Sequence, residues 1–82
     1  MTYRAELSDR VLRQLAGFPA KAFDALITTM ANVAGYPDDP IRTLPTDDPY
    51  IRRAVFGEAG LVTYLIDDAR MVVTLTDVTW AG

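Results

Sequence analysis

Two different hydrophobic periods divide the chain. Apolar side chains recur at helical spacing through the first half and at the spacing of strands through the last third. Ser8 is a good N-cap for a first helix, which Gly17 closes, and Pro19 opens a second helix that ends at Gly35. Because only Phe18 and Pro19 interrupt the pattern, the two helices are expected to form an antiparallel hairpin.

The apolar stripes of both helices are predicted to face the core. Each stripe follows the i, i+3, i+4 pattern of an amphipathic helix, which favours packing over a ligand-binding role. The predicted core positions are Val11, Leu12 and Leu15 in the first helix and Phe23, Leu26, Ile27, Met30, Val33 and Ala34 in the second.

Extended segments flank the helices. Thr2–Leu7 alternates weakly between apolar and polar positions and predicts a first strand. Tyr50–Phe56, Leu61–Ile66 and Met71–Asp77 predict three more strands, and the short turns between them imply an antiparallel meander. The predicted order of elements is therefore β-α-α-β-β-β.

The segment Tyr36–Pro49 has a different character. It contains four prolines and four aspartates. Prolines at this density exclude a helix and a central strand, so we predict an ordered surface loop. Ile41 and Leu44 are its apolar residues, and we expect them to anchor the loop to the core.

Together these elements predict an α+β fold and a single domain over residues 1–82. The helical hairpin has to pack on one face of a four-stranded, mainly antiparallel sheet to bury its apolar stripes. The other face of the sheet stays partly open, and it is the place where we expect the functional residues.

Composition narrows the possible chemistry. The chain has neither cysteine nor histidine, which excludes disulfides, thiolate metal sites, cysteine nucleophiles and the usual general base near neutral pH. Zinc would depend on carboxylates alone, so no metal and no cofactor are expected. No segment reaches the apolar length of a membrane span and no signal peptide is evident, so we expect a soluble cytoplasmic protein with no membrane partner.

The charge of the chain argues against an extended nucleic-acid surface. The net charge is −3, and cations do not outnumber anions either before or after Tyr50. Phosphate contacts supply most of the affinity for nucleic acids. A nucleic-acid site would therefore have to be local and built from a few arginines.

Taken in order, these segments resemble the RelE/ParE superfamily of bacterial type II toxins. They look like the family's opening strand and first helix, its break before the second helix, its arginine-led hairpin with a tyrosine and an acidic turn, and its last strand. The segments that carry the resemblance are Tyr3–Leu15, Ala16–Pro19, Tyr50–Arg53 with Gly57, Val62–Asp68 and Val72–Val78.

The resemblance implies a growth-inhibiting toxin that a cognate antitoxin keeps silent by wrapping it with a helix or an added strand. One branch of the family cleaves messenger RNA on the ribosome, and another poisons DNA gyrase. The cleaving members need no metal, because basic residues on the sheet stabilise the phosphate while the 2′-hydroxyl attacks it.

The basic residues of the cleaving pattern are depleted in this chain. Arg52 matches the family's first basic position on the second strand. Uncharged residues stand at the other positions where cleaving members often carry basic or catalytic side chains: Ala54, Leu61, Thr74 or Thr76, and Thr79-Trp80. The loss of one such donor can cost about 2.7–4 kcal/mol of transition-state stabilisation. Any RNA cleavage is therefore expected to be weak.

Arg52 and Arg53 are the leading candidates for function. Neighbours in a strand point to opposite faces, so only one of the two can lie on the open face. Each arginine either contacts a phosphate or a partner, or forms an ion pair with Asp47, Asp48 or Asp77. Asp77 itself is either a general base or the partner of an arginine across the sheet.

The remaining candidates also allow two interpretations. Tyr64 either stacks on a base or is a core aromatic residue, and the core is favoured. Trp80 is either folded back onto the sheet or exposed for a partner, and Arg70 is a further binding candidate. The pairs Asp38-Asp39 and Asp67-Asp68 could hold a hard cation, but aspartate is favoured in turns for backbone reasons.

We therefore predict the toxin of a type II toxin–antitoxin module, which acts by weakened ribosome-dependent mRNA cleavage or by binding a protein such as DNA gyrase. If it is an enzyme, it is a metal-independent endoribonuclease. The candidate catalytic residues are Arg52, as phosphate anchor, Arg53 and Asp77, and the candidate binding residues are Tyr64, Trp80 and Arg70. The alternatives are a non-catalytic interaction domain on the toxin scaffold and an enzyme that uses the aspartates with a cation.

Overall fold

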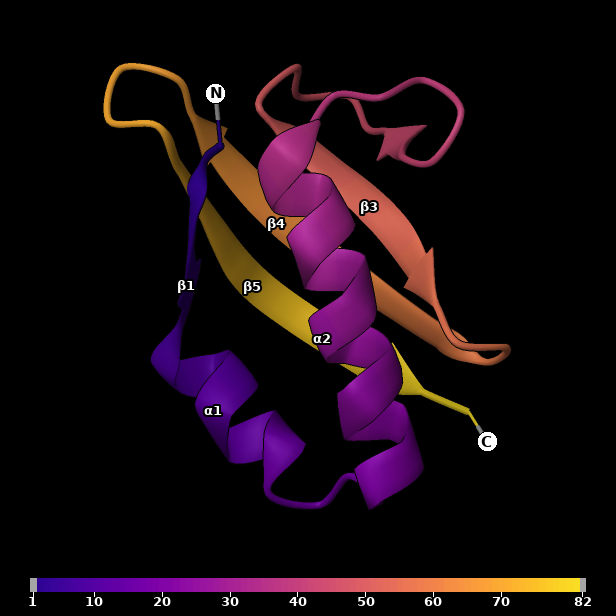
Figure 1. Ribbon diagram of the computed structural model, residues 1–82. Helices are drawn as coiled ribbons and strands as arrows, with labels where there is room; N and C mark the ends of the chain where they lie inside the picture. Colours follow the sequence, from indigo (N-terminus) through magenta and orange to yellow (C-terminus); the bar gives the residue numbers. More distant parts are fainter. Residues whose placement is uncertain (1, 82) are drawn as a thin grey trace.

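A five-stranded sheet with two helices forms the molecule. The computed structural model describes residues 2–81. Its helices are α1 (Asp9–Leu15) and α2 (Ala20–Gly35), and its strands are β1 (Arg4–Leu7), β2 (Leu44–Pro45), β3 (Ile51–Phe56), β4 (Gly60–Asp67) and β5 (Val72–Trp80). The strand order is β1-β5-β4-β3-β2 (Figure 1). Only the β1–β5 pair is parallel among these strands, so the predicted α+β class and mainly antiparallel sheet are confirmed.

The helices begin where the sequence places their caps. The Ser8 backbone is extended, and its hydroxyl oxygen accepts a hydrogen bond of 3.2 Å from the backbone N–H of Val11. This bond satisfies one of the N–H groups that the first turn leaves without an intrahelical partner. Pro19 is the N-cap of α2 rather than its first residue. In Figure 1, α2 crosses in front of the sheet and α1 lies near the lower ends of β1 and β5.

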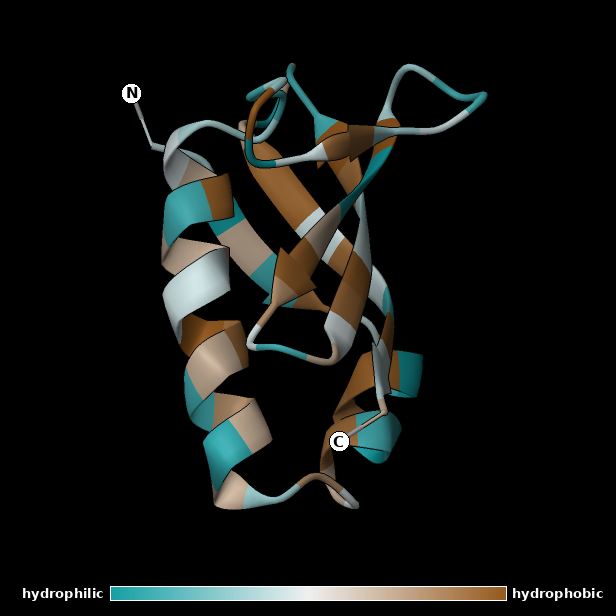
Figure 2. Cartoon of the chain, turned by 90° about the vertical axis from the view of Figure 1, so that its right-hand side faces the viewer, coloured by the Kyte–Doolittle hydropathy of each residue, from teal (hydrophilic) through white to brown (hydrophobic). Residues whose placement is uncertain are grey.

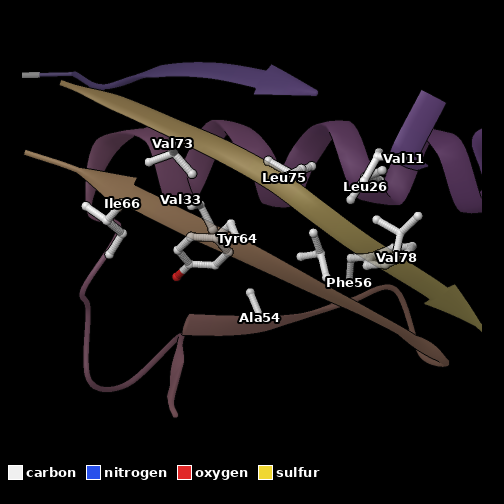
Figure 3. Close-up of a cluster of buried hydrophobic side chains, with 11 residues drawn as sticks. Val11, Leu26, Val33, Ala54, Phe56, Tyr64, Ile66, Val73, Leu75 and Val78 are labelled. Carbon is white, nitrogen blue, oxygen red and sulfur yellow. The ribbon is translucent and has the colours of Figure 1, made fainter. Parts of the chain in front are cut away.

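The core lies between α2 and the sheet. Figure 3 shows side chains of α1, α2 and strands β3, β4 and β5 meeting in one cluster. Phe56 is fully buried, with its ring stacked between Phe18 at 6.4 Å and Trp80 at 5.8 Å between ring centroids. Stacked aromatic pairs of this kind add to the stabilisation from area burial.

The apolar stripes of the helices are only partly buried. Leu26 and Val33 of α2 and Val11 of α1 lie in the core as predicted. Leu12 is 54% exposed, and on α2 Phe23 and Ile27 are 42% and 49% exposed, so placing these three in the core is wrong. The small sheet contacts a narrower stripe of α2 than the sequence pattern marks, and Ala22, which is fully buried, lies in that stripe.

The loop between α2 and β3 contributes a fifth strand. The short strand β2 pairs with β3 through Leu44 opposite Arg53 and Pro45 opposite Arg52. A proline is tolerated there because β2 is an edge strand whose outer side needs no ladder hydrogen bond. The prediction of four strands was therefore one too few. In Figure 2 this loop forms the top of the molecule.

Polar contacts help to hold that loop to the body. Ile41 is 92% exposed and Leu44 is 50% exposed, so the predicted apolar anchors are wrong. Thr43, by contrast, is 2% exposed. Its hydroxyl donates a hydrogen bond of 2.5 Å to the backbone oxygen of Asp39 and accepts one from Arg52.

Neither helix in residues 2–81 is long and apolar enough to cross a membrane.

A bulge in β5 changes the direction of its second half. The register between β4 and β5 shifts between Thr63 and Tyr64: Thr63 lies opposite Asp77, but Tyr64 lies opposite Leu75. Two residues of β5 therefore fill the space of one residue of β4. Beyond the end of β1, the backbone N–H of Val78 is bonded at 3.1 Å to the side-chain oxygen of Gln14 in α1.

Candidate functional site

Arg52 and Arg53 lie on opposite faces of the sheet. In β3, Ala54 and Phe56 are buried in the core, whereas Arg53 and Val55 are exposed. Since side chains alternate along a strand, Arg52 shares the side of α2 and Arg53 the far side. The structure thus separates the two arginines that the sequence presents as a pair.

Arg52 is held in a polar niche beneath the loop. Its Nε donates a hydrogen bond of 2.8 Å to the hydroxyl oxygen of Thr43, and one Nη lies 3.4 Å from the Thr43 backbone oxygen. In the described part of the chain this arginine forms no ion pair, so neither Asp47 nor Asp48 is its partner. These hydrogen bonds make Arg52 one of the residues that attach the loop to the sheet.

Tyr64 belongs to the core, the interpretation that the sequence favours. Its ring is fully buried, and its hydroxyl donates a hydrogen bond of 2.6 Å to the backbone oxygen of Pro37. Figure 3 shows this oxygen at the border of the apolar cluster. Burial raises the pKa of Tyr64 above its usual 10.0, and Thr43 and Arg52 offset part of that rise. The ring has no surface left on which a base could stack.

We call the face of the sheet turned away from α2 the open face. Arg53 is its one cation on strands β3 and β4. Leu44, which is paired with Arg53, Val55 and Leu65 are about half exposed, at 50%, 58% and 41%. The open face includes Leu44, Ile51, Arg53, Val55, Leu61, Thr63, Leu65, Asp67, Thr74, Asp77 and Thr79.

Asp77 lies opposite Thr63, the residue that pairs with Arg53, but its carboxylate is bonded to α1 and not to Arg53. Its Oδ1 accepts a hydrogen bond of 2.8 Å from Gln14 and one of 3.1 Å from Arg10, both in α1. The bulge next to Asp77 brings this carboxylate toward the helix. Among the described residues, its cation partner is therefore Arg10, and a general base at Asp77 would have to act away from the centre of the open face.

The other two binding candidates lie far apart along the chain's last hairpin. Trp80, at the end of β5, stacks on Phe56 and also lies close to Gly57. It is folded back onto the core, one of the two possibilities that the sequence left open. Arg70 lies in the β4–β5 turn, with one Nη 3.9 Å from the carboxylate of Asp67. At that exposed position the pair contributes little to stability.

One aspartate of each pair, Asp39 and Asp67, has a local role in its turn. Asp39 accepts the backbone N–H of Ile41 at 2.9 Å, and Asp67 accepts that of Arg70 at 3.1 Å. Asp68 accepts the hydroxyl of Tyr3 at 2.5 Å, a bond that raises the pKa of Tyr3 because the carboxylate disfavours a phenolate beside it. Within residues 2–81 no three carboxylates gather into a set that could hold a metal ion.

A groove of about 720 Å³ lies between the C-terminal half of α2 and the following loop. Asn32, Tyr36, Arg42 and Val55 are among its lining residues. Neither Arg52 nor Arg53 belongs to the lining, so the groove does not include these two candidates.

Two residues with structural importance have no clear signal in the sequence. Thr43 is a single threonine in a proline-rich loop, and Gln14 is a single amide on a polar helix face. Their partners are Arg52, nine residues after Thr43, and Val78, 64 residues after Gln14. The pairing of β2 with β3 brings Thr43 to Arg52, and the packing of α1 beside β5 brings Gln14 to Val78.

Comparisons with known proteins define the fold. No family model matches the chain, and no curated protein matches it in sequence. Among solved structures, the RelBE2 toxin–antitoxin complex of Mycobacterium tuberculosis is similar with a TM-score of 0.85 and 17% identity over 99% of this chain and 93% of that one. The intact RelBE complex of Escherichia coli gives 0.82 and 17%, with 98% of both chains covered.

Two further solved structures extend the comparison. A mutant of the E. coli toxin RelE in the free state is similar with a TM-score of 0.84 and 17% identity, over 99% of this chain and 85% of that one. The archaeal RelE–RelB complex from Pyrococcus horikoshii gives 0.75 and 20%, with 100% and 98% covered. The chain thus has the fold of the RelE toxins, and the fold that the sequence resemblance implies is confirmed.

Proposed function

We propose that this protein is the toxin of a type II toxin–antitoxin module and that its partner is a cognate antitoxin. The observation that carries the proposal is the similarity of nearly the whole chain to RelE toxins, several of them solved in complexes with an antitoxin. We also propose that it acts in the bacterial cytoplasm, where translation and gyrase are found.

Within that function we infer that the toxin acts mainly by contacting a protein. RNA cleavage without a metal requires several donors to stabilise the charge that develops on the phosphate. Here Arg52 is already bonded to Thr43, and Arg53 is the one cation on the open face of β3 and β4. Asp77, the candidate base, is bonded to α1. This arrangement supports contact with a protein such as DNA gyrase over an mRNA interferase.

The test is controlled induction in a bacterial host, with growth, translation and DNA supercoiling recorded separately. The proposal predicts arrested growth without ribosome-dependent mRNA fragments. Rapid mRNA cleavage that is lost in the Arg52→Ala variant would instead support the endoribonuclease and the role of Arg52 as phosphate anchor. Cleavage that survives Arg52→Ala would exclude that role.

The second candidate function is a non-catalytic interaction domain on the toxin scaffold. Two of the three candidate catalytic residues, Arg52 and Asp77, are held in structural hydrogen bonds, and this favours it. It predicts normal growth after induction, together with stable binding to the antitoxin encoded beside it. Coexpression of the two chains and purification of the complex would separate this candidate from a toxin.

A further inference from the structure

Among the described residues of the central strands β3 and β4, Arg53 is the only cation on the open face. The side chains around it come from cross-strand and same-strand neighbours: Thr63 and Leu44 lie directly opposite, and Ile51 and Val55 lie two residues away on its own strand. In the described part of the chain, Arg53 forms no ion pair and its side chain makes no hydrogen bond. Its guanidinium is therefore available to a partner.

Other charges on this side of the sheet are distant or already paired. Arg4 of β1 is paired with Glu6 at 3.4 Å, Asp67 of β4 with Arg70 at 3.9 Å, and Asp77 of β5 with Arg10 at 3.1 Å. β1 lies three strands away from β3 in the sheet, which corresponds to about 14 Å at the usual strand spacing. A partner that covers the middle of the open face thus meets one positive charge within an apolar and threonine-rich surface.

This pattern fits a protein better than RNA. A single-stranded RNA site combines several cations along the backbone with aromatic rings on which bases stack. The open-face positions of β3 and β4 carry one cation and no aromatic ring. Protein interfaces, by contrast, have a weakly charged centre in which arginine is enriched and often dominates the binding energy.

We propose that Arg53 anchors a protein-binding site on the open face and that the partner is a protein segment with one carboxylate flanked by apolar side chains. Charge complementarity assigns the carboxylate, since an arginine desolvated without a counter-charge would oppose binding. Leu44, Val55 and Leu65, each about half exposed, provide the apolar surface around the pair. The proposal refines the contact surface of the proposed toxin, but its test below does not depend on toxicity.

The test is a selection of short randomised peptides displayed on phage against the wild-type protein and, separately, against Arg53→Glu. The proposal predicts that wild-type binders share one Asp or Glu between apolar residues and lose at least about tenfold in affinity for Arg53→Glu. It also predicts that binders selected on Arg53→Glu carry Lys or Arg at that position. Arg53→Gln should reduce affinity without reversing the charge preference.

The control is Arg13→Glu, which makes the same change of charge at an exposed position of α1 away from the open face. It should bind the selected peptides as the wild type does, and circular dichroism should show both charge-reversed variants folded. Binders without a shared carboxylate, or binders equally tight on Arg53→Glu, would overturn the proposal. So would binding of a single-stranded RNA oligonucleotide that requires Arg53. A failure of growth inhibition alone would overturn the toxin function but leave this result standing.

Discussion

Two residues that the sequence resemblance marks for function have structural roles in this fold. Arg52 occupies a position that looks like the family's phosphate anchor, yet it is bonded to Thr43. Tyr64 looks like the hairpin tyrosine, yet it lies in the core and is bonded to Pro37. Both residues attach the loop after α2 to the sheet, so their substitution should change stability before it changes any chemistry.

Tyr64 should make the stability of the fold depend on pH in the alkaline range. The fold raises the pKa of Tyr64, so its contribution is fully present below the unfolded pKa of about 10 and is lost as pH rises through the folded value. Chemical denaturation of the wild type and Tyr64→Phe as a function of pH measures this. The variant should lose about 1–3 kcal/mol at neutral pH, because the Pro37 oxygen loses its donor.

The difference between these two proteins should then shrink above about pH 10. A difference that stays constant up to strongly alkaline pH would contradict the burial of the phenol. Tyr36→Phe is the control, since this tyrosine is 73% exposed.

Gly60 should tolerate no side chain. A Cβ at this position would lie 2.5 Å from the ring of Phe56, which is fully buried and stacked between two other aromatic residues. Gly60→Ala is therefore expected to cost about 1–3 kcal/mol in unfolding free energy, the usual range for overpacking. Thermal and denaturant unfolding measure the change.

The matched control is Gly35→Ala at the end of α2, where an added Cβ would meet no atom within 4 Å. It should be neutral or slightly stabilising, because alanine favours a helix more than glycine does. Equal destabilisation of the two variants would be inconsistent with the packing around Phe56.

At the scale of elements, α1 closes the edge of the sheet that β1 leaves uncovered. β1 pairs with β5 only as far as Leu75, and the backbone N–H of Val78 is bonded to Gln14 instead of a strand. Gln14 also donates to Asp77. A side chain of α1 thus replaces the missing length of β1, and the sheet edge at Val78 is satisfied.

Gln14→Ala should therefore weaken the fold more than a surface substitution. It leaves the N–H of Val78 without its acceptor and removes a donor to Asp77, for an expected loss of about 1–3 kcal/mol. Amide hydrogen exchange of Val78 should also become faster relative to that of Leu75. Arg13→Ala, on the neighbouring exposed position of α1, is the control and should stay within about 0.5 kcal/mol of the wild type.

The elements with a strong local signal could be predicted from the sequence, and those set by distant partners could not. Ser8 marks the start of α1, and the alternation in residues 50–80 gives three strands. β2 is missed because a strand of two residues is too short to show a periodic hydrophobic pattern. The environment of Asp77 is missed because it depends on a bulge that shifts the pairing of β4 with β5 by one residue.

For the whole molecule, the main result is a RelE-like sheet whose open face carries one cation on the central strands β3 and β4. The separation of Arg52 from Arg53 follows from strand alternation alone, and the sequence could predict it. The register of the sheet decides which of the two arginines lies on the side of the helices, and only the structure gives that register. The proposed action through a protein contact depends on Arg53 being the arginine on the open face.

The most direct test of this account is the growth rate of a bacterial host after induction of the wild type, Arg53→Glu and Arg13→Glu at equal protein levels. The account predicts arrest by the wild type and by Arg13→Glu, and growth close to the uninduced rate with Arg53→Glu. Arrest by all three proteins would contradict a role for the open face, and unimpaired growth with all three would contradict the toxin itself.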